Sequence, residues 1–293
     1  MTDKQQSDQT PDTGPDGTRT INLEVEVPGT PDEVWRAIAT GPGISSWYVP
    51  HEVEERAGGA ATASFGPGPE MQIAGRVAVW EPPHRVVFDG NVDDESEEDG
   101  SDGGDTDEAD ADSPDAGLAF EWLIEAKDGG TCIVRLVNSG FGAGSEHDDW
   151  YDAMTEGWKL FLYNLKLHLQ HFGGQTATAM LPMATWSGSN TNAWTTLADA
   201  LDITAEPTVG ERLEVGTEDT PTLAGKVSRV TPTYLALLVD EPAPGTAFLA
   251  AERHQGDQAQ VSIWAYLYGS EGATAVERDE PRWREWLGRR AEA

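Results

Sequence analysis

The stretch INLEVEVPGTPDEVWRAIAT, residues 21–40, switches from a strand pattern to a helix pattern and decides how the chain begins to fold. Apolar and polar residues alternate from Ile21 to Val27, which is typical of a half-buried strand. Thr30 is a good N-cap, and Pro31 suits the first helical position ahead of two acidic residues. We therefore expect one strand followed by a short helix.

Beyond this helix, the pattern predicts a meander of antiparallel strands closed by a long helix. Gly, Pro or acidic turns separate six strand-like runs: EVEER, GGAATASFG, EMQIAGRVAVW, HRVVFDG, LAFEWLIEAKD and TCIVRLVNSG. Residues 146–174, EHDDWYDAMTEGWKLFLYNLKLHLQHFGG, then repeat apolar residues every three or four positions. That spacing makes one broad helix face apolar, so we expect this helix to lie across the sheet.

Three segments carry a resemblance to a known superfamily: PDEVWRAIATGPGISSWYVP (31–50), AGRVAVWEPPHRVVFDG (74–90) and EGWKLFLYNLKLHLQHF (156–172). Their order and spacing resemble the SRPBCC (START-like) superfamily, in the branch of homologues of the activator of the heat-shock protein 90 ATPase. The resemblance covers residues 19–173. It implies an α+β helix-grip (START/Bet v 1-like) fold, in which a curved antiparallel sheet wraps a long C-terminal helix.

The resemblance also implies an apolar cavity between the sheet and the long helix. Trp47 and Tyr48 lie in a short connection after the first helix, and we expect them at the mouth of that cavity. They could form a gate over a ligand or a plug that seals the core. The other candidate lining residues are apolar, and ordinary core packing is the alternative for each of them: Met71, Ile73, Val77, Phe88, Phe120, Trp122, Met154, Trp158 and Phe161.

The second half of the chain, residues 174–293, resembles the first half. AGRVAVWEPPHRVV aligns with AGKVSRVTPTYLAL, so that Ala74-Gly75 matches Ala224-Gly225, and Trp283 takes the place of Trp158. We interpret this as a tandem duplication with a degenerate second copy. It has no counterpart of SSWYVP, and we expect its last helix to be shorter. We expect this copy to brace the first as an internal pseudo-dimer partner.

The charge is strongly acidic, with 52 Asp and Glu against 19 Lys and Arg and a net charge of −33. Such a charge repels nucleic acid and anionic membranes. Residues 91–117 hold 13 acids and no Lys or Arg, which predicts a disordered insertion. We expect a disordered tail over residues 1–18. Because that tail has no signal-peptide pattern and the chain has no bilayer-length apolar run, we expect a cytoplasmic protein.

Few residues suggest catalysis or metal binding. His51 and Glu52 are adjacent, but a strand would direct their side chains to opposite faces. His168 and His171 are three apart near a helix end, where histidines are favourable without a metal, and no third ligand accompanies them. A single cysteine, Cys132, excludes an internal disulfide. We therefore predict no catalytic residue, no metal and no cofactor.

The function we predict is non-catalytic binding of a small hydrophobic molecule in the cavity of the first domain. Two alternatives follow from the resemblance. One is a chaperone-associated stress or regulatory protein, although only an acidic tail precedes the fold here. The other is a polyketide cyclase/aromatase-like enzyme. An enzyme would need polar groups inside the cavity, and we can name only His51, Arg76 and Arg135.

Overall fold

The computed structural model describes residues 12–13, 19–66, 68–90, 118–141, 148–203, 207–254 and 256–291. The acidic insertion expected to be disordered, 91–117, lies outside these residues. Within the tail expected to be disordered, Asp12–Thr13 form a short strand, β1, that pairs with the next strand. Disorder was therefore the wrong prediction for these two residues.

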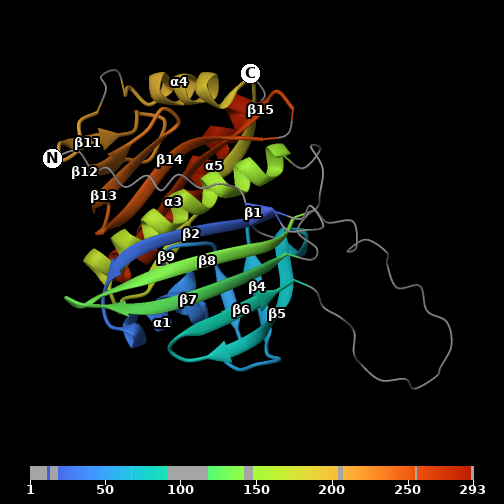
Figure 1. Ribbon diagram of the computed structural model, residues 1–293. Coiled ribbons are helices and arrows are strands. Elements are labelled where there is room, and N and C mark those ends of the chain that lie inside the picture. Colours follow the sequence, from blue (N-terminus) through green and yellow to red (C-terminus); the bar gives the residue numbers. More distant parts are fainter. Residues whose placement is uncertain are drawn as a thin grey trace.

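Residues 19–172 together with β1 form the N-terminal unit, whose strands make one antiparallel sheet in the order β1-β2-β8-β7-β6-β5-β4-β3 (Figure 1). The strands are β2 (Arg19–Pro28), β3 (His51–Val53), β4 (Ala60–Ser64), β5 (Gln72–Glu81), β6 (Arg85–Asp89), β7 (Ala119–Lys127) and β8 (Thr131–Phe141). The helices are α1 (Pro31–Ala39), α2 (Gly41–Ile44), the 3-10 helix η1 (Pro69–Met71) and α3 (Asp148–Phe172). The predicted order of strand, helix, six strands and long helix is confirmed.

The predicted start of the first helix is confirmed in detail. The Thr30 hydroxyl accepts a hydrogen bond from the Glu33 amide at 3.4 Å, and the Glu33 carboxylate accepts one from the Thr30 amide at 2.8 Å. This reciprocal pair is a capping box. The short helix α2 was not predicted. It begins directly after α1, where a Cβ on Gly43 would overlap the Arg36 carbonyl oxygen, so this sharp corner requires glycine.

Residues 177–291 form the C-terminal unit around a second antiparallel sheet, in the order β10-β15-β14-β13-β12-β11 with β9 also paired to β15. The elements are β9 (Ala177–Met180), β10 (Met183–Ser187), α4 (Asn190–Ala200), β11 (Arg212–Val215), β12 (Leu223–Val230), β13 (Tyr234–Glu241), β14 (Gly245–Arg253), β15 (Gln258–Tyr268) and α5 (Gly269–Ala291). Helix α5 has 23 residues and α3 has 25. The last helix is thus shorter, as expected, but only by two residues, because α5 begins well before its charged second half.

The two sheets share their strand order and one local irregularity. β2 pairs with the last strand of the first sheet, β8, as β9 and β10 pair with the last strand of the second, β15, and the strands beyond follow as an antiparallel meander. A β-bulge interrupts β5 between Val77 and Val79, and another interrupts β12 between Val227 and Arg229, at the same offset along the chain. Gly58 donates its amide hydrogen to the Val77 carbonyl, as Gly210 does to that of Val227. The two sheets are thus alike in this bulge and in the hydrogen bond beside it.

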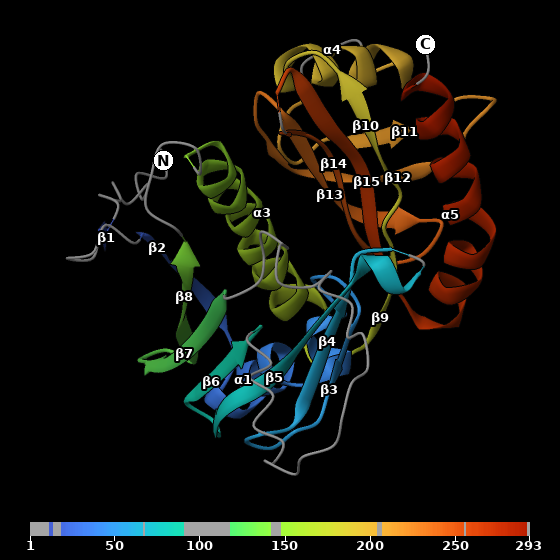
Figure 2. The same ribbon diagram turned by 90° about the vertical axis from the view of Figure 1, so that its right-hand side faces the viewer.

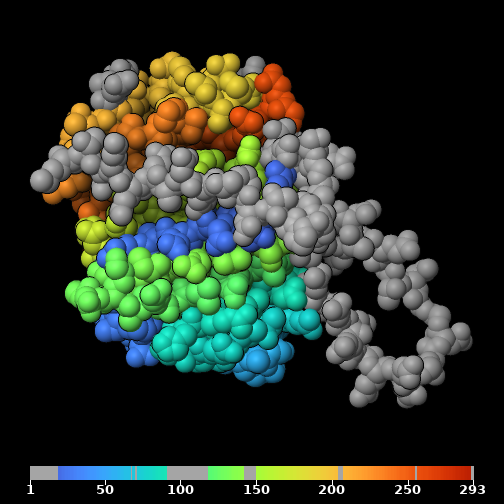
Figure 3. Space-filling model, viewed as in Figure 1, coloured from blue at the N-terminus to red at the C-terminus, as the bar shows by residue number. Residues whose placement is uncertain are grey.

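The units stack in layers, in the order first sheet, α3, second sheet, and then α4 with α5 (Figures 1 and 2). Helix α3 packs on the first sheet through residues such as Leu165, and against the second sheet through Leu160 and Leu167. Figure 3 shows the orange and red C-terminal unit resting on the blue and green strands, with α3 between them. As a result, β14 is buried on both faces from Gly245 to Ala251.

Among the residues described, none of the helices combines the length and the apolar character that crossing a bilayer requires.

Candidate functional site

The N-terminal unit contains an apolar cavity, partly open to solvent, between its sheet, the α1–α2 corner and α3. The space that the centre of a water-sized sphere can reach inside it is about 90 Å³. The lining residues are Ile38, Ile44, Trp47, Tyr48, His51, Ala61, Thr62, Ala63, Phe65, Ile73, Ala74, Gly75, Arg76, Phe88, Asp89, Gly90, Phe120, Trp122 and Trp158. Aromatic and aliphatic side chains dominate this set, which is typical of small-molecule sites.

The structure brings most of the predicted lining residues to this cavity. Those on its wall are Trp47, Tyr48, Ile73, Phe88, Phe120, Trp122 and Trp158. The other four are elsewhere. Val77 is completely buried in the surrounding core, and Met154 packs against the same core. Met71 ends the 3-10 helix beside Gly66, and Phe161 packs between the units, with its ring 5.3 Å from that of Trp264.

The prediction missed the small residues of the wall. Strand β4 contributes Ala61, Thr62 and Ala63, and Gly75 on β5 pairs with Ala61 across the sheet. A Cβ on Gly75 would meet the Asp89 carbonyl oxygen at 2.6 Å, so the backbones can approach closely only with glycine there. The signal was present in GGAATASFG, a strand with almost no large side chains. Small residues on one wall leave the space that large residues on the opposite wall do not fill.

Aromatic rings form the wall on the α3 side. The Tyr48 ring centroid lies 4.9 Å from that of Trp158 and 4.5 Å from that of Phe161. Trp122 lies 5.7 Å from both Trp47 and Trp158, edge to face in each case. These separations are those of favourable aromatic pairs, so the rings support one another around the cavity.

The segment Ser45–Pro50, which we call the cavity loop, is held firmly by its contacts. Trp47 is 1% exposed, and its indole N–H donates to the Ala37 carbonyl at 2.9 Å. Val49 is completely buried, whereas Tyr48 is only partly buried and lines the cavity. Trp47 therefore makes the contacts expected of a plug and not of a mobile gate. Tyr48 is the less buried ring of the pair.

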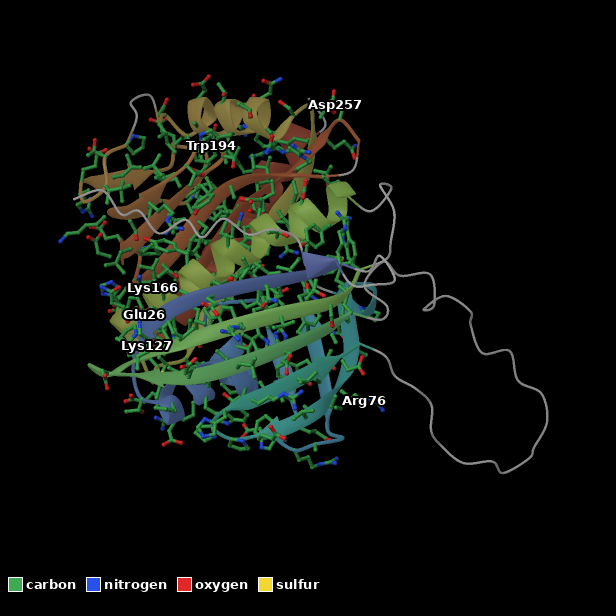
Figure 4. All side chains as sticks on the ribbon, in the orientation of Figure 1. Glu26, Arg76, Lys127, Lys166, Trp194 and Asp257 are labelled. Carbon is green, nitrogen blue, oxygen red and sulfur yellow. The ribbon has the colours of Figure 1, made fainter. Side chains whose placement is uncertain are left out.

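Two of the three polar residues named from the sequence lie on the cavity wall. His51 Nδ1 is 2.8 Å from the Val49 carbonyl, so this nitrogen carries the proton and donates it. Burial lowers the pKa of His51 to about 4, which keeps the ring neutral near pH 7. Arg76 pairs with Asp89 at 3.7 Å, and Figure 4 shows it on the first sheet. Arg135 does not reach the cavity, because it pairs with Glu24 at 2.6 Å on the exposed side of the sheet.

The other candidate chemical groups lie outside the cavity. As predicted, Glu52 is exposed while His51 is not. His168 is buried, and its Nδ1 is 2.6 Å from the Tyr268 hydroxyl, whereas His171 is exposed. In the part of the chain that the structure describes, no three His, Cys, Asp or Glu residues come together as metal ligands would. Cys132 is buried, and burial raises the pKa of its thiol.

The volume sets the size of molecule that the cavity can hold. An engineered apolar cavity of about 150 Å³ binds benzene, and the space here is about 90 Å³. A single ring would thus need a small movement of the wall or would protrude through the open side.

A second, polar groove lies on the C-terminal unit. It measures about 240 Å³ and is lined by Thr220, Pro221, Thr222, Glu241, Pro242, Arg278, Asp279 and Arg282. Although it is larger than the cavity, its only buried charge, Asp279, is already neutralised by Arg278 and Arg282. It therefore offers no unpaired buried charge to an ionic ligand.

A curved antiparallel sheet that grips a long C-terminal helix over an apolar cavity defines an SRPBCC-type, helix-grip fold. Residues 28–170 match the family model described as "Activator of Hsp90 ATPase homolog 1-like protein". The N-terminal unit is therefore a domain of this family, as its three signature segments indicated.

Several solved structures are similar to this chain at low identity. The Aha1 dimer from Colwellia psychrerythraea is 18% identical over 52% of this chain and 96% of its own, with a TM-score of 0.38. The di-domain ARO/CYC BexL from the BE-7585A biosynthetic pathway is 17% identical over 94% of this chain and 93% of its own, with a TM-score of 0.41. DynU16 from the dynemicin biosynthetic locus is 14% identical over 92% and 96%, with a TM-score of 0.40. No curated protein matches the chain.

Proposed function

We propose that the N-terminal unit binds a small hydrophobic molecule in its cavity and does not catalyse a reaction on it. The observation that carries this proposal is the cavity itself, whose wall combines the rings of Tyr48, Trp122 and Trp158 with the small residues of β4. Apolar surface of this kind gains free energy when a ligand replaces water, at ~25 cal/mol for each Å² buried. A compact molecule of about one ring is the largest that we expect to enter, with a small movement of the wall or with part of it protruding through the open side.

We also propose that residues 174–293 are a degenerate second copy of the domain at 19–173, joined to it as an internal pseudo-dimer. The shared strand order and the bulges at Val77 and Val227 support this duplication. In this proposal the second copy acts as a brace and has no ligand of its own. A cytoplasmic location is part of the same proposal, and the lone, buried Cys132 is consistent with it.

Association with a chaperone, suggested by the description of the family, is less well supported. Stable protein interfaces are anchored by large apolar or aromatic side chains. Among the described residues, only Val209 and Val230 are large hydrophobic side chains with substantial exposure. A chaperone would have to bind through the polar and acidic surface.

A cyclase-like or aromatase-like enzyme is the second candidate, because His51 and Arg76 lie on the cavity wall. His51 is neutral near pH 7, and its Nδ1 is occupied by the Val49 carbonyl, so only Nε2 is available to accept a proton. An enzyme would lose turnover in His51→Gln while still binding its ligand. A binding protein has no turnover to lose.

Filling the cavity tests the binding proposal. Benzene is titrated into the protein, and the NMR chemical shifts of the methyl groups of Ala61, Ala63 and Ile73 are followed. We expect saturable shifts in the wild type. Ala61 is buried on the cavity wall, so Ala61→Leu should fill the space and weaken binding by at least about tenfold, as expected when one ring-sized site is blocked.

Ala60→Leu is the matched control, because Ala60 is exposed on the same strand and outside the cavity lining. It should bind benzene like the wild type. Thermal unfolding of both variants separates loss of binding from loss of folding, since overpacking costs ~1–3 kcal/mol. If benzene produces no saturable shift in the wild type, the binding proposal is wrong.

A further inference from the structure

The cavity loop is in contact with the C-terminal unit on the side away from the cavity. Ser46 is 1% exposed, and its hydroxyl accepts a hydrogen bond from the Ala177 amide of β9 at 3.0 Å and donates one to the Pro42 carbonyl at 2.8 Å. The loop that lines the cavity is thus bonded to a strand of the other unit.

Asn164 on α3 makes a second connection between the loop and the C-terminal unit. Its side-chain amide donates to the Trp47 carbonyl at 2.8 Å, and its oxygen accepts from the Thr246 hydroxyl of β14 at 2.8 Å. Asn164 and Thr246 are both completely buried. Because a buried amide is oriented by the partners that satisfy it, Thr246 determines which way Asn164 presents its N–H to the loop.

Tyr268 makes the third connection. Its hydroxyl donates to the Ser46 carbonyl at 3.3 Å and lies 2.6 Å from His168 Nδ1. Because the tyrosine has one hydrogen and gives it to Ser46, the histidine nitrogen donates to the tyrosine oxygen. Burial lowers the pKa of His168 to about 4, so the histidine is neutral here. The Tyr268 ring also stacks on Phe172 at 4.0 Å, which fixes its position.

The C-terminal unit therefore holds the carbonyl groups of two successive loop residues. Tyr268 binds the Ser46 carbonyl directly, and Thr246 orients the Asn164 amide that binds the Trp47 carbonyl. We propose that Thr246 and Tyr268 are positioning residues, which hold the cavity loop in place and so set the shape of the cavity. Neither residue lines the cavity. The consequence for a ligand rests on the proposed function, whereas the effect on the loop does not. The C-terminal unit would then be a part of the binding site.

Amide hydrogen exchange in the ligand-free protein tests the positioning. In Thr246→Val and Tyr268→Phe, each of which removes one hydroxyl and keeps the shape, we expect the amides of residues 46–48 to exchange about tenfold faster, as for the loss of one buried hydrogen bond. Amides in the middle of β13, such as that of Leu237, should keep their wild-type rates.

Two variants are matched controls. Thr246→Ser keeps the hydroxyl and should restore slow exchange in the loop. Tyr266→Phe removes a buried hydroxyl from the same strand as Tyr268, but that hydroxyl has no hydrogen-bond partner among the described residues, so loop exchange should not change. The proposal is overturned if loop exchange is unchanged in Thr246→Val and Tyr268→Phe, or if it accelerates equally in β13 or in Tyr266→Phe.

Benzene binding by the same variants keeps the two proposals separate. If the wild type binds benzene, we expect its affinity to fall by about threefold to tenfold in Thr246→Val and Tyr268→Phe, in step with the opening of the loop. If the wild type does not bind benzene but loop exchange responds as described, the binding function is wrong and the positioning role stands.

Discussion

The interior of the N-terminal unit is partly hollow, whereas the corresponding interior of the C-terminal unit is filled. Trp283 and Trp286 on α5 are both completely buried, with their rings edge to face at 5.8 Å. The Trp186 indole also reaches this core and donates to the Leu287 carbonyl at 3.2 Å. In the N-terminal unit, Trp158 faces a cavity instead. Similar strand orders therefore support both a cavity and a solid core.

The difference arises from side-chain volume and from one loop. The N-terminal unit has β3 and the cavity loop between its first helices and β4, whereas α4 leads to β11 without such a strand among the described residues. Ala61 and Ala63 leave space in the first sheet. In the second sheet, β14 and β15 pack both of their faces, with Leu249 and Ile263 on the inner core and Phe248 and Tyr266 against α3. The outer face of these two strands thus packs against α3 of the hollow unit.

Of the changes considered, removing one tryptophan from each interior should have the largest effect on stability. It tests whether the C-terminal interior is the better packed of the two. Truncating a buried tryptophan typically lowers the free energy of unfolding by ~3–5 kcal/mol. We expect the loss in Trp283→Ala to be near the upper end of this range and the loss in Trp158→Ala to be near the lower end. Trp283 is surrounded by packed atoms, but Trp158 already borders empty space. Urea unfolding measures both losses in the free energy of unfolding.

Trp194→Ala is the control for this pair, because Trp194 on α4 is only partly buried (Figure 4). Its loss should be smaller than either of the others. If Trp158→Ala destabilises the protein more than Trp283→Ala does, the N-terminal interior is the better packed of the two, and the comparison fails.

The pH dependence of stability tests the packing of the interface between the units at Glu252. Glu252 lies on β14, where burial, together with repulsion from Glu156 on α3, raises the pKa of its carboxyl group from 4.5 to about 7. The folded protein therefore keeps this proton between pH 4.5 and 7, while the unfolded chain loses it. Stability from this group is complete below pH 4.5 and is lost as the pH rises through 7.

Glu252→Gln has no such proton to lose, so its free energy of unfolding should fall less than that of the wild type between pH 5 and pH 8. We expect a difference on the order of 1 kcal/mol, or ~2–4 °C in Tm. Glu156→Gln removes only the weaker cause and should have a smaller effect. Parallel pH profiles for the wild type and Glu252→Gln would show that Glu252 is solvated and that the interface is open there.

Deleting residues 93–114 should have the smallest effect, and it tests whether the N-terminal unit needs the insertion that the C-terminal unit lacks. The flanking strands are already closed, since Asp89 pairs with Ala119 and the Gly90 amide donates to the Leu118 carbonyl at 3.0 Å. We expect a change in the free energy of unfolding of no more than ~0.5 kcal/mol, because shortening a loop alters closure entropy only slightly. A drop in Tm of many degrees would show that the insertion packs or binds an ion.

Some of this molecule follows from local patterns alone. Residues close together in the sequence predict the capping box at Thr30, the strands of the first sheet and the apolar face of α3. Such patterns depend on the period of an element and on hydrogen bonds between near neighbours. For the same reason, seven of the eleven predicted lining residues lie on the cavity wall. The pattern identified which side chains turn inward.

Only the tertiary structure decided which inward side chains meet empty space. Met154 and Phe161 follow the same helical period as Trp158, yet only Trp158 borders the cavity, while Met154 packs in the surrounding core and Phe161 between the units. Asn164 looks like a surface residue in an amphipathic helix, but it becomes completely buried because the second sheet packs against α3 and brings Thr246 to it. Cavities and buried polar bridges depend on side-chain volumes and hydrogen-bond partners that are far away in the sequence. The local periodicity of a helix or strand therefore cannot predict them.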